Sequence, residues 1–230
     1  MENLILQQFF VFTFPERHDK MCSYLYFSFL RGQTMDSNFF ALISRMRYIA
    51  RWGLMRNALP ENIQEHSHMV AVLAHALGVI RRDIFHQPCD VNALATAALY
   101  HDASEILTGD LPTPIKYHNA EIMSAYHAVE DLAVQKLLGM LPPELRETYA
   151  DVLAEDKDGD IYPLVKAADK LSAYIKCIEE RKAGNNEFLS AEAQTRAALE
   201  ASPLPEVQYF LEHFIPAFER DLDELGAIGQ

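Results

Sequence analysis

The sequence contains little cysteine, and what it has follows no recognisable spacing. Three cysteines, Cys22, Cys89 and Cys177, occur in 230 residues without a CxxC motif or an evident pairing pattern. A fold built on a disulfide framework is therefore not indicated. We interpret the three residues as free thiols of a protein in a reducing cytosol.

Positive charge is also scarce. Lys and Arg number 20 against 33 Asp and Glu, which gives a formal net charge of −13. Proteins that bind DNA or RNA polymers need basic stripes that displace counterions, so this composition argues against nucleic-acid polymers as partners. A small anionic substrate remains compatible with it, provided that a local cation attracts the anion.

Long apolar runs are missing as well. No uninterrupted run approaches the roughly 20 residues needed to cross a bilayer. The N-terminal stretch is apolar, but it carries Glu2 and has neither a basic leader nor a small-residue cleavage site. We therefore expect no signal peptide, no membrane partner and a cytoplasmic location. Residues 1–34 are interpreted as an aromatic-rich extension, and whether they belong to the native protein is left open.

From Met35 onward the apolar residues recur with helical period. Half of all residues are hydrophobic, as in a folded globular domain. The pattern predicts helices near 37–50, 63–83, 91–107, 119–139, 143–154, 161–183, 188–201 and 205–225. Asp90 is a predicted N-cap, and Gly184 follows the end of a helix. The expected fold is a single all-α domain of about seven or eight helices, spanning residues 35–230.

The apolar stripe of the predicted helix 91–107 turns ionisable in its last turn. Leu94, Ala98, His101, Asp102 and Glu105 share one face of this helix. Burying carboxylates without partners costs several kcal/mol, so such groups normally pair, change protonation state or bind metal. This face therefore marks a candidate site.

Two further helices carry a polar residue on an apolar stripe. His66 begins the stripe of helix 63–83, and Asp169 lies on the inner face of helix 161–183, three residues before Ser172. With His101 and Asp102 they form a set of two imidazoles and two carboxylates. Such a mixed nitrogen and oxygen set suits Mn, Co, Fe or Zn. Four protein ligands would leave coordination positions open for water and substrate, as in catalytic metal sites.

The simpler alternative is that each histidine is a satisfied core residue. A single histidine on an apolar stripe usually has that role, and a lone His-Asp pair is uninformative. Three coincident stripes that carry only ligand-type residues favour the metal site.

Three segments resemble a known superfamily. "NIQEHSHMVAVLAHAL", "AALYHDASEILTGDLPTPIKY" and "LVKAADKLSAYIKCIEE" look like the His…His-Asp…Asp pattern of the HD-domain metal-dependent phosphohydrolases. More narrowly, the chain from about Met35 to its end resembles the bacterial 5′-deoxynucleotidases of the YfbR type. The segments "RWGLMRN", "TGDLPTP" and "AGNNEFL" belong to this resemblance.

The resemblance implies a role for each site residue. The metal ligands would be His66, His101, Asp102 and Asp169. Glu105 would orient or activate the attacking water. The substrate pocket would include Arg51 on the phosphate, Trp52 at the sugar edge where a 2′-hydroxyl would sit, and Thr108 and Asp110 in contact with the nucleotide, alongside His66, Asp102 and Glu105.

The implied activity is hydrolysis of deoxyribonucleoside 5′-monophosphates, selective against ribonucleotides. The implied cofactor is a divalent cation such as Co or Mn, and the implied assembly is a homodimer. Trp52 has an alternative role as a core anchor. Two other functions remain open: an HD hydrolase of nucleoside triphosphates, alarmones or cyclic dinucleotides, and an HD domain that binds without turnover.

Other polar patterns are assigned no site. The acidic run at 155–160 lacks the Gly and Glu positions of an EF-hand and is interpreted as a solvated turn. His68 and His75 point away from the ligand stripe of helix 63–83. "GNNEF" is interpreted as a helix end followed by a turn.

Overall fold

The computed structural model describes residues 37–116, 118–154 and 159–226. The described residues belong to one unit that begins at Ser37. The predicted extension 1–34 and residues 155–158 of the acidic run lie outside them. The boundary between extension and domain therefore stays a prediction.

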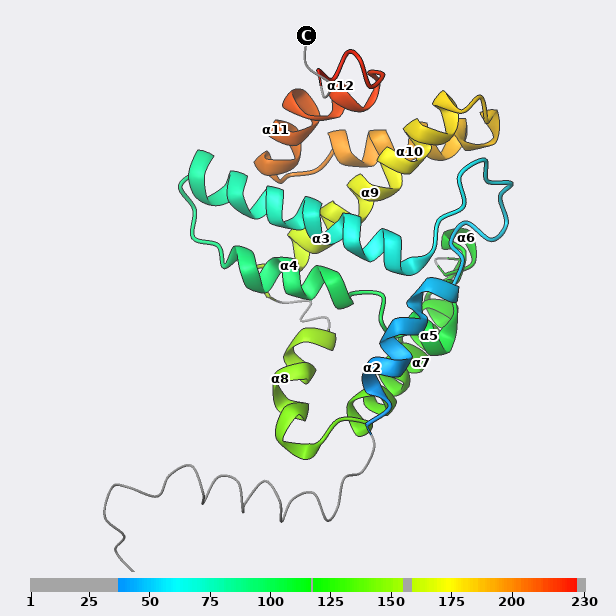
Figure 1. The fold of residues 1–230 in the computed structure, drawn as a ribbon, viewed down its shortest axis with the longest axis vertical. Helices are drawn as coiled ribbons and strands as arrows, with labels where there is room; N and C mark the ends of the chain where they lie inside the picture. Colours follow the sequence, from blue (N-terminus) through cyan, green and yellow to red (C-terminus); the bar gives the residue numbers. More distant parts are fainter. Residues whose placement is uncertain (1–36, 117, 155–158, 227–230) are drawn as a thin grey trace, which may run out of the picture. The chain divides into compact units, whose positions relative to one another are not determined.

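The described chain is all-α (Figure 1). Its α-helices are α2 (Phe39–Ile43), α3 (Ile63–Val79), α4 (Val91–Tyr100), α5 (Glu105–Thr108), α6 (Thr113–Lys116), α7 (Ala120–Gly139), α8 (Pro143–Leu153), α9 (Tyr162–Lys182), α10 (Leu189–Glu200), α11 (Pro205–His213) and α12 (Ile215–Phe218). Shorter turns are the 3₁₀-helices η2 (Ser44–Tyr48) and η4 (Asn186–Phe188) and the π-helical turn η3 (Ile80–Ile84). Among the described residues, the only β pairing is an isolated antiparallel bridge between Ala50 and Asn62. The prediction of an all-α fold with about seven or eight helices is confirmed.

Local sequence chemistry sets where the two central helices begin. The side chain of Asn62 accepts from the backbone N–H groups of Gln64 and Glu65 in a capping box that starts α3. Asp90 caps α4, as predicted, because its side chain accepts from the backbone N–H groups of Asn92 and Ala93. Each cap satisfies donors that have no partner within the helix.

Helix α3 packs between α4 and α9 (Figure 1). The three helices share the larger hydrophobic core, to which Val70, Leu77, Leu94 and Leu171 contribute fully buried side chains. At Gly78 of α3, a Cβ atom would lie 3.0 Å from the side chain of Leu94 on α4. The absence of a side chain therefore permits the close approach of α3 and α4. A second cluster around Phe39, Leu137 and Leu141 packs α2 against α7 and the second half of α8.

The predicted helix 91–107 is wrong in one respect, because it breaks where the ionisable residues begin. Helix α4 ends at Tyr100, and residues 101–104 form a turn before α5. Bonds from Ala103 N–H to Tyr100 O (2.9 Å) and from Glu105 N–H to Asp102 O (3.0 Å) replace the α-helical pattern. The His101 and Asp102 side chains of this turn are only 3% and 20% exposed.

Two other predicted helices are also interrupted. The segment 37–50 divides into α2 and η2. The segment 205–225 divides into α11 and α12, and its residues 219–225, predicted as helix, form turns. In the second case Pro216, which has no N–H group to continue the ladder, lies in the first turn of α12. Neither break alters the position of a candidate site residue.

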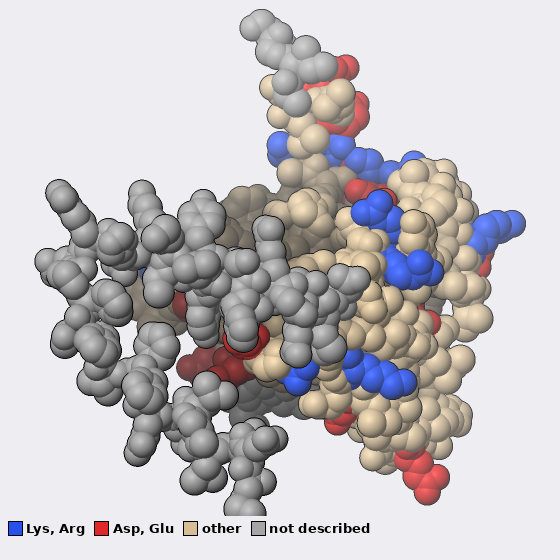
Figure 2. All heavy atoms as spheres, turned by 60° about the horizontal axis from the view of Figure 1, so that its bottom comes forward, with Lys and Arg blue, Asp and Glu red and all other residues tan. Residues whose placement is uncertain are grey.

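The surface agrees with the low content of basic residues. On the face drawn in Figure 2, Lys and Arg side chains of the described residues form separate small groups with acidic side chains among them. Within the part of the chain that the structure describes, each helix is too short or too polar to traverse a bilayer.

Candidate metal and nucleotide site

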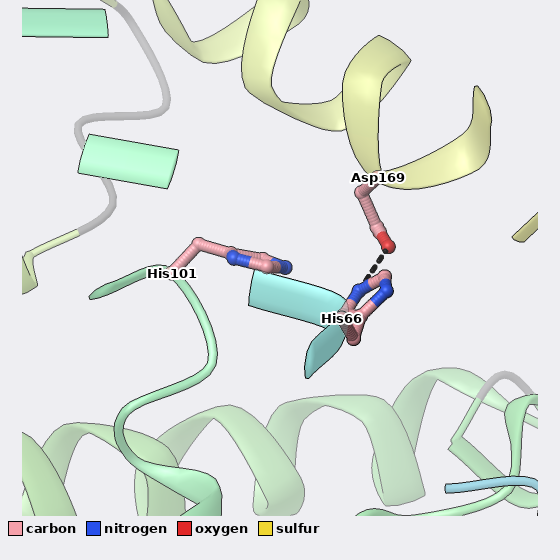
Figure 3. A group of neighbouring side chains, drawn as sticks. All are labelled: His66, His101 and Asp169. Atoms are coloured by element: carbon pink, nitrogen blue, oxygen red, sulfur yellow. Dashed lines mark ion pairs between the residues drawn. The ribbon is translucent and has the colours of Figure 1, made fainter. Parts of the chain in front are cut away.

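The four predicted ligand side chains lie together at one end of the α3–α4–α9 core. His66 comes from the first turns of α3, His101 and Asp102 from the turn after α4, and Asp169 from the middle of α9. Figure 3 shows His66, His101 and Asp169 converging from these segments. One potential ligand atom from each of the three lies within 4.8 Å of the others.

Asp102 closes this cluster. Its Oδ2 lies 3.5 Å from Nε2 of His66 and 3.2 Å from Nε2 of His101, and Asp169 Oδ1 lies 3.0 Å from Nε2 of His66. The structure therefore brings His66, His101 and Asp169 together and places Asp102 beside both histidines, so that the four side chains are neighbours, as the stripes predict. Their role as metal ligands stays a prediction.

Hydrogen bonds on the far side of each ring fix the orientation of both imidazoles. Nδ1 of His66 lies 3.1 Å from Oγ of the buried Ser172, and Nδ1 of His101 lies 2.7 Å from the carbonyl oxygen of Ala98. A carbonyl oxygen accepts only, so Nδ1 of His101 carries a proton, and in the neutral ring Nε2 then presents a lone pair. The same tautomer suits His66, whose Nδ1–H would donate to the Ser172 hydroxyl oxygen and leave the lone pair on Nε2.

The two Nε2 atoms are buried and have no hydrogen-bond partner among the described residues. A neutral imidazole lone pair that faces a carboxylate oxygen is unfavourable unless a cation lies between them. Buried polar atoms in native proteins are almost always satisfied. The donor set therefore fits a divalent cation held by two nitrogens and two carboxylates.

The pKa values of the carboxylates reflect the same crowding. Burial would raise the pKa of Asp102, but the adjacent His101 outweighs it and the net pKa lies far below the usual range. Burial would likewise raise the pKa of Asp169, but the adjacent imidazoles of His66 and His101 outweigh it and the net pKa is lowered. Burial lowers the pKa of His101, but Asp102 overcomes this and the net value is raised. Both aspartates are thus held in the ionised form that a metal requires.

Glu105 lies beside this cluster without belonging to it. It is the first residue of α5 and is only 8% exposed. Burial, with the nearby charges of Asp102 and Asp110, raises the pKa of Glu105 to about 10. A bound cation would offset the excess negative charge that these acidic groups place around Glu105.

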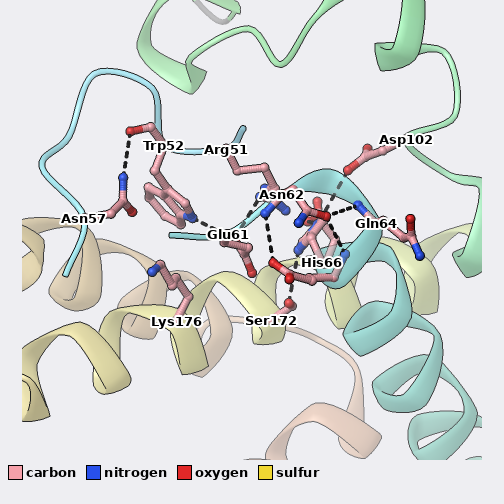
Figure 4. Close-up of polar contacts among 12 residues, drawn as sticks. Arg51, Trp52, Asn57, Glu61, Asn62, Gln64, His66, Asp102, Ser172 and Lys176 are labelled. Atoms are coloured by element: carbon pink, nitrogen blue, oxygen red, sulfur yellow. Dashed lines mark hydrogen bonds and ion pairs between the residues drawn. The ribbon is translucent and has the colours of Figure 1, made fainter. Parts of the chain in front are cut away.

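Arg51 supplies the positive charge on the other side of the cluster (Figure 4). Its side chain is 14% exposed, and Nε lies 3.6 Å from Oε2 of Glu61. Burial would lower the pKa of Arg51, but Asp102 and Asp169 raise it further above its usual value. Its Nη1 is buried without a hydrogen-bond partner in the described structure. One donor of this guanidinium is thus available to an anion.

Trp52 is half-buried and adopts a backbone conformation that is unusual for a large side chain. Its φ is +59°, in the left-handed region. The indole Nε1–H donates to Oε2 of Glu61 at 3.0 Å, and the ring packs against Phe188 with centroids 5.2 Å apart. Trp52 therefore has an anchored side and an exposed side. The two predicted roles, anchor and pocket wall, are compatible in this geometry.

Thr108 and Asp110 flank the glycine that ends α5. Gly109 has φ +76°, which lets the chain turn sharply after the helix. The Thr108 hydroxyl donates to the carbonyl oxygen of Gly109 at 3.1 Å and lies 3.5 Å from the hydroxyl of Tyr126. Burial raises the pKa of Asp110, although Arg51 and the backbone N–H of Trp52 oppose this. Both residues lie near the site, and their contacts with a nucleotide stay a prediction.

Sequence reasoning missed two residues that organise the site. Ser172, which orients His66, shares the inner face of α9 with Asp169, so its position on that stripe was a usable signal. Glu61, which contacts both Arg51 and Trp52, lies between a proline and the N-cap of α3, where no pattern distinguishes it. His68 and His75 are exposed, in agreement with their expected orientation away from the ligands.

Comparisons with known proteins agree with this geometry. Residues 38–218 match the family described as 5′-deoxynucleotidase YfbR-like. The 5′-deoxynucleotidase YfbR of Shigella boydii is 50% identical over 192 residues, which cover 83% of this chain and 96% of that protein.

Solved structures give the same fold. An HD-domain phosphohydrolase of Listeria innocua superposes with a TM-score of 0.70 at 26% identity, covering 79% of this chain and 88% of that one. The HD phosphohydrolase of cyanophage S-2L, solved with dA and one catalytic zinc ion, matches with a TM-score of 0.51 at 26% identity. The match covers 80% of this chain and 96% of the cyanophage chain. The chain belongs to the YfbR-like 5′-deoxynucleotidase family of HD-domain phosphohydrolases.

Proposed function

We propose that this chain is a metal-dependent 5′-deoxynucleotidase, which hydrolyses deoxyribonucleoside 5′-monophosphates to deoxynucleoside and phosphate and discriminates against ribonucleotides. The observation that carries the proposal is a set of buried, unpartnered polar atoms in one place. They are Nε2 of His66, Nε2 of His101 and Nη1 of Arg51. Two of them are suited to a cation and the third to an anion. The name of the Shigella relative and the ligands of the cyanophage structure support the same chemistry.

The proposed metal ligands are His66, His101, Asp102 and Asp169. A divalent cation bound there would act as a Lewis acid toward the phosphoryl oxygens and make water more acidic. Two carboxylate ligands would nearly neutralise the cation's charge. A dianionic phosphate therefore needs a further cation, which Arg51 provides. Co and Mn are the proposed metals for a first test, with Zn included because the cyanophage relative contains it.

Arg51 would bind the phosphate through its free guanidinium donor, while Glu61 holds the other side of the group. With a divalent cation at the cluster to offset the acidic groups that raise its pKa, Glu105 would be ionised and would act as the general base. A water oxygen forms a bond to phosphorus as the bond from phosphorus to O5′ breaks. The water's proton passes to the Glu105 carboxylate, and O5′ leaves as the alcohol after taking up that proton from the Glu105 carboxyl group.

Trp52 would select deoxyribose by steric exclusion. An indole edge beside C2′ leaves no space for a hydroxyl group and offers it no acceptor, because its one polar atom already donates to Glu61. Thr108 and Asp110, which flank Gly109, would contact the nucleotide. A homodimer and a cytoplasmic location are also proposed for the chain. Size-exclusion chromatography with light scattering tests the first, and fractionation of cells tests the second.

Phosphate release from a panel of nucleotides tests the function. The protein is stripped with EDTA and assayed with dAMP, AMP, dATP and a cyclic dinucleotide, each with Co²⁺, Mn²⁺, Zn²⁺ or no metal. The proposal expects release from dAMP that depends on metal and greatly exceeds release from AMP. Turnover of only dATP or the cyclic dinucleotide would support a different HD hydrolase, and binding without any release would support a non-catalytic HD domain.

The Trp52→Ala variant tests the selectivity separately. The proposal expects a ten- to hundredfold fall in the ratio of kcat/KM for dAMP to that for AMP, on the order of the discrimination that a steric pocket supplies. A variant that still refused AMP would remove Trp52 from the selectivity.

A further inference from the structure

The segment that carries Arg51 and Trp52 is a loop closed at its base by backbone pairing. Ala50 and Asn62 form the isolated antiparallel bridge, and Arg51 N–H donates to Glu61 O at 3.0 Å. Between them the chain makes an excursion over residues 52–60 that contains no α-helix. We call residues 51–61 the pocket loop.

The second half of the pocket loop is held by a buried carboxylate, Glu180 of α9. This side chain has 0% exposure. Its Oε2 accepts from the backbone N–H of Ala58 at 2.8 Å, and its Oε1 accepts from that of Leu59 at 3.0 Å. The sequence separation exceeds 120 residues, so these bonds join two distant parts of the chain.

Two side chains complete the same arrangement. Nδ2 of Asn185 donates to Glu180 Oε2 at 2.8 Å and to the carbonyl oxygen of Arg56 at 2.7 Å. Lys176, one turn before Glu180 on α9, donates both to Glu180 Oε1 and to the carbonyl oxygen of Leu59. Figure 4 shows Lys176 projecting from α9 toward the loop. We call Lys176, Glu180 and Asn185 the latch.

The latch reaches Trp52 through Phe188. The Nζ atom of Lys176 lies 5.6 Å from the centroid of the Phe188 ring, and this fully buried ring packs against Trp52 at 5.2 Å. The latch thus fixes both the backbone of residues 56–59 of the pocket loop and the Phe188 ring against which the indole packs.

We propose that Glu180 is a positioning residue, which sets the Trp52 and Arg51 geometry and thereby the affinity for nucleotide and the preference for deoxyribose. The expected kinetic effects rest on the proposed function, whereas the placement of the loop by Glu180 does not.

The chemistry of the latch requires a carboxylate at position 180. All four of its partners are donors: two backbone N–H groups, an amide nitrogen and an ammonium group. An ionised carboxylate is acceptor-only and has lone pairs for all four. In Glu180→Gln, the new NH₂ group would face donors and could accept from none of them. The variant therefore changes the hydrogen bonds to Ala58 and Leu59 while it preserves the shape of the side chain.

Trp52 is the only tryptophan in the chain, so its fluorescence reports the state of the pocket loop directly. In Glu180→Gln we expect a red-shifted emission maximum and stronger quenching by acrylamide, because the indole loses its fixed contacts with Phe188 and Glu61. The KM for dAMP should rise and the dAMP/AMP ratio of kcat/KM should fall. A displacement of about 1 Å in a positioning group costs up to about a hundredfold in kcat/KM. The kcat should change little, since Glu105 and the metal ligands lie on other segments.

Glu206→Gln is the matched control. Glu206 is also a buried glutamate, 2% exposed. It lies on α11, away from the pocket loop, and its Oε1 is 2.6 Å from Nε of Arg81. This variant should lose stability without changing Trp52 emission, quenching or the dAMP/AMP ratio. If it alters them as Glu180→Gln does, general destabilisation explains both and the proposal is wrong.

The fluorescence and kinetic results decide different parts of the inference. Unchanged emission and quenching in a folded Glu180→Gln protein would overturn the positioning role. Altered fluorescence with an unchanged dAMP/AMP ratio would overturn the effect on selectivity. If the unmodified protein released no phosphate from any nucleotide, the proposed function would fail, while the fluorescence comparison would still decide the placement of the loop.

A milder variant covers the case in which Glu180→Gln does not fold. Asn185→Ala removes the bond to the Arg56 carbonyl oxygen and one of the four bonds to Glu180 from a partly exposed position. We expect the same direction of change in fluorescence and in the dAMP/AMP ratio, with smaller size. No change in either would contradict the latch.

Discussion

Ser172→Ala tests the metal site through a residue that touches no substrate. The variant removes one hydroxyl oxygen, which lies 3.1 Å from Nδ1 of His66. Ser172 is 2% exposed, so solvent has little access to replace the lost partner. The His66 Nδ1–H would then be buried and unsatisfied, or its proton would move to Nε2, where it would block the lone pair required by a metal.

The expected magnitude follows from this geometry. Leaving a buried donor unpaired costs about 1–3 kcal/mol. Loss of a group that orients a metal ligand typically weakens metal binding by roughly 10- to 100-fold, and each factor of ten corresponds to about 1.4 kcal/mol. We therefore expect the Kd for Co²⁺ to rise by about 10- to 100-fold. Calorimetric titration of the EDTA-stripped protein measures it.

Ser67→Ala provides the control. Ser67 is also 2% exposed and lies next to His66 on α3, but its Oγ has no hydrogen-bond partner in the described structure. The same change of side chain there should leave the Kd unaltered. Equal weakening in both variants, or undiminished Co²⁺ binding in Ser172→Ala, would refute the orientation of His66 by Ser172.

Three further predictions concern the pocket and the latch. Arg51→Lys loses the planar fork that Glu61 orients, and kcat/KM for dAMP should fall roughly 10- to 100-fold, mainly through KM, in steady-state assays. Glu105→Gln keeps the size of the side chain but not the proton acceptor, and kcat should fall about 10²- to 10⁴-fold while the Kd for Co²⁺ in calorimetry stays unchanged; near-normal turnover would exclude the general-base role. The pKa of Glu180 is lowered from 4.5 to about 2, because hydrogen bonds from Lys176 and others outweigh the effect of burial. Its ionisation therefore stabilises the fold above pH 4.5, and that contribution is lost as the pH falls from 4.5 toward 2. In urea unfolding, the stability advantage of the unmodified protein over Glu180→Gln should shrink across that window.

The ligand cluster could be predicted from sequence because it depends on local periodicity. His66 and Asp169 occupy inward positions of helices that the apolar pattern defines well. The turn at 101–104 could not be predicted, because a turn with hydrogen bonds between residues i and i+3 contains the same kinds of residue as the end of an α-helix. The error did not displace His101 and Asp102 from the inner side of the core.

The organisation of the pocket loop could not be predicted in the same way. Glu180 lies near the end of an amphipathic helix, where a glutamate close to a lysine suggests an exposed ion pair. Its burial depends on backbone donors more than 120 residues earlier in the sequence, which no local pattern reveals. The "GNNEF" segment was interpreted as a helix end and a turn, and the structure adds a contact from Asn185 to the pocket loop. Long-range polar contacts of this kind require the fold.

Anomalous scattering from cobalt, in crystals of the protein grown with Co²⁺, tests whether the four side chains hold a metal. We predict one strong peak at the end of the α3–α4–α9 core, within bonding distance of His66, His101, Asp102 and Asp169. A map with no peak there, or with cobalt bound only to other acidic groups, would contradict it.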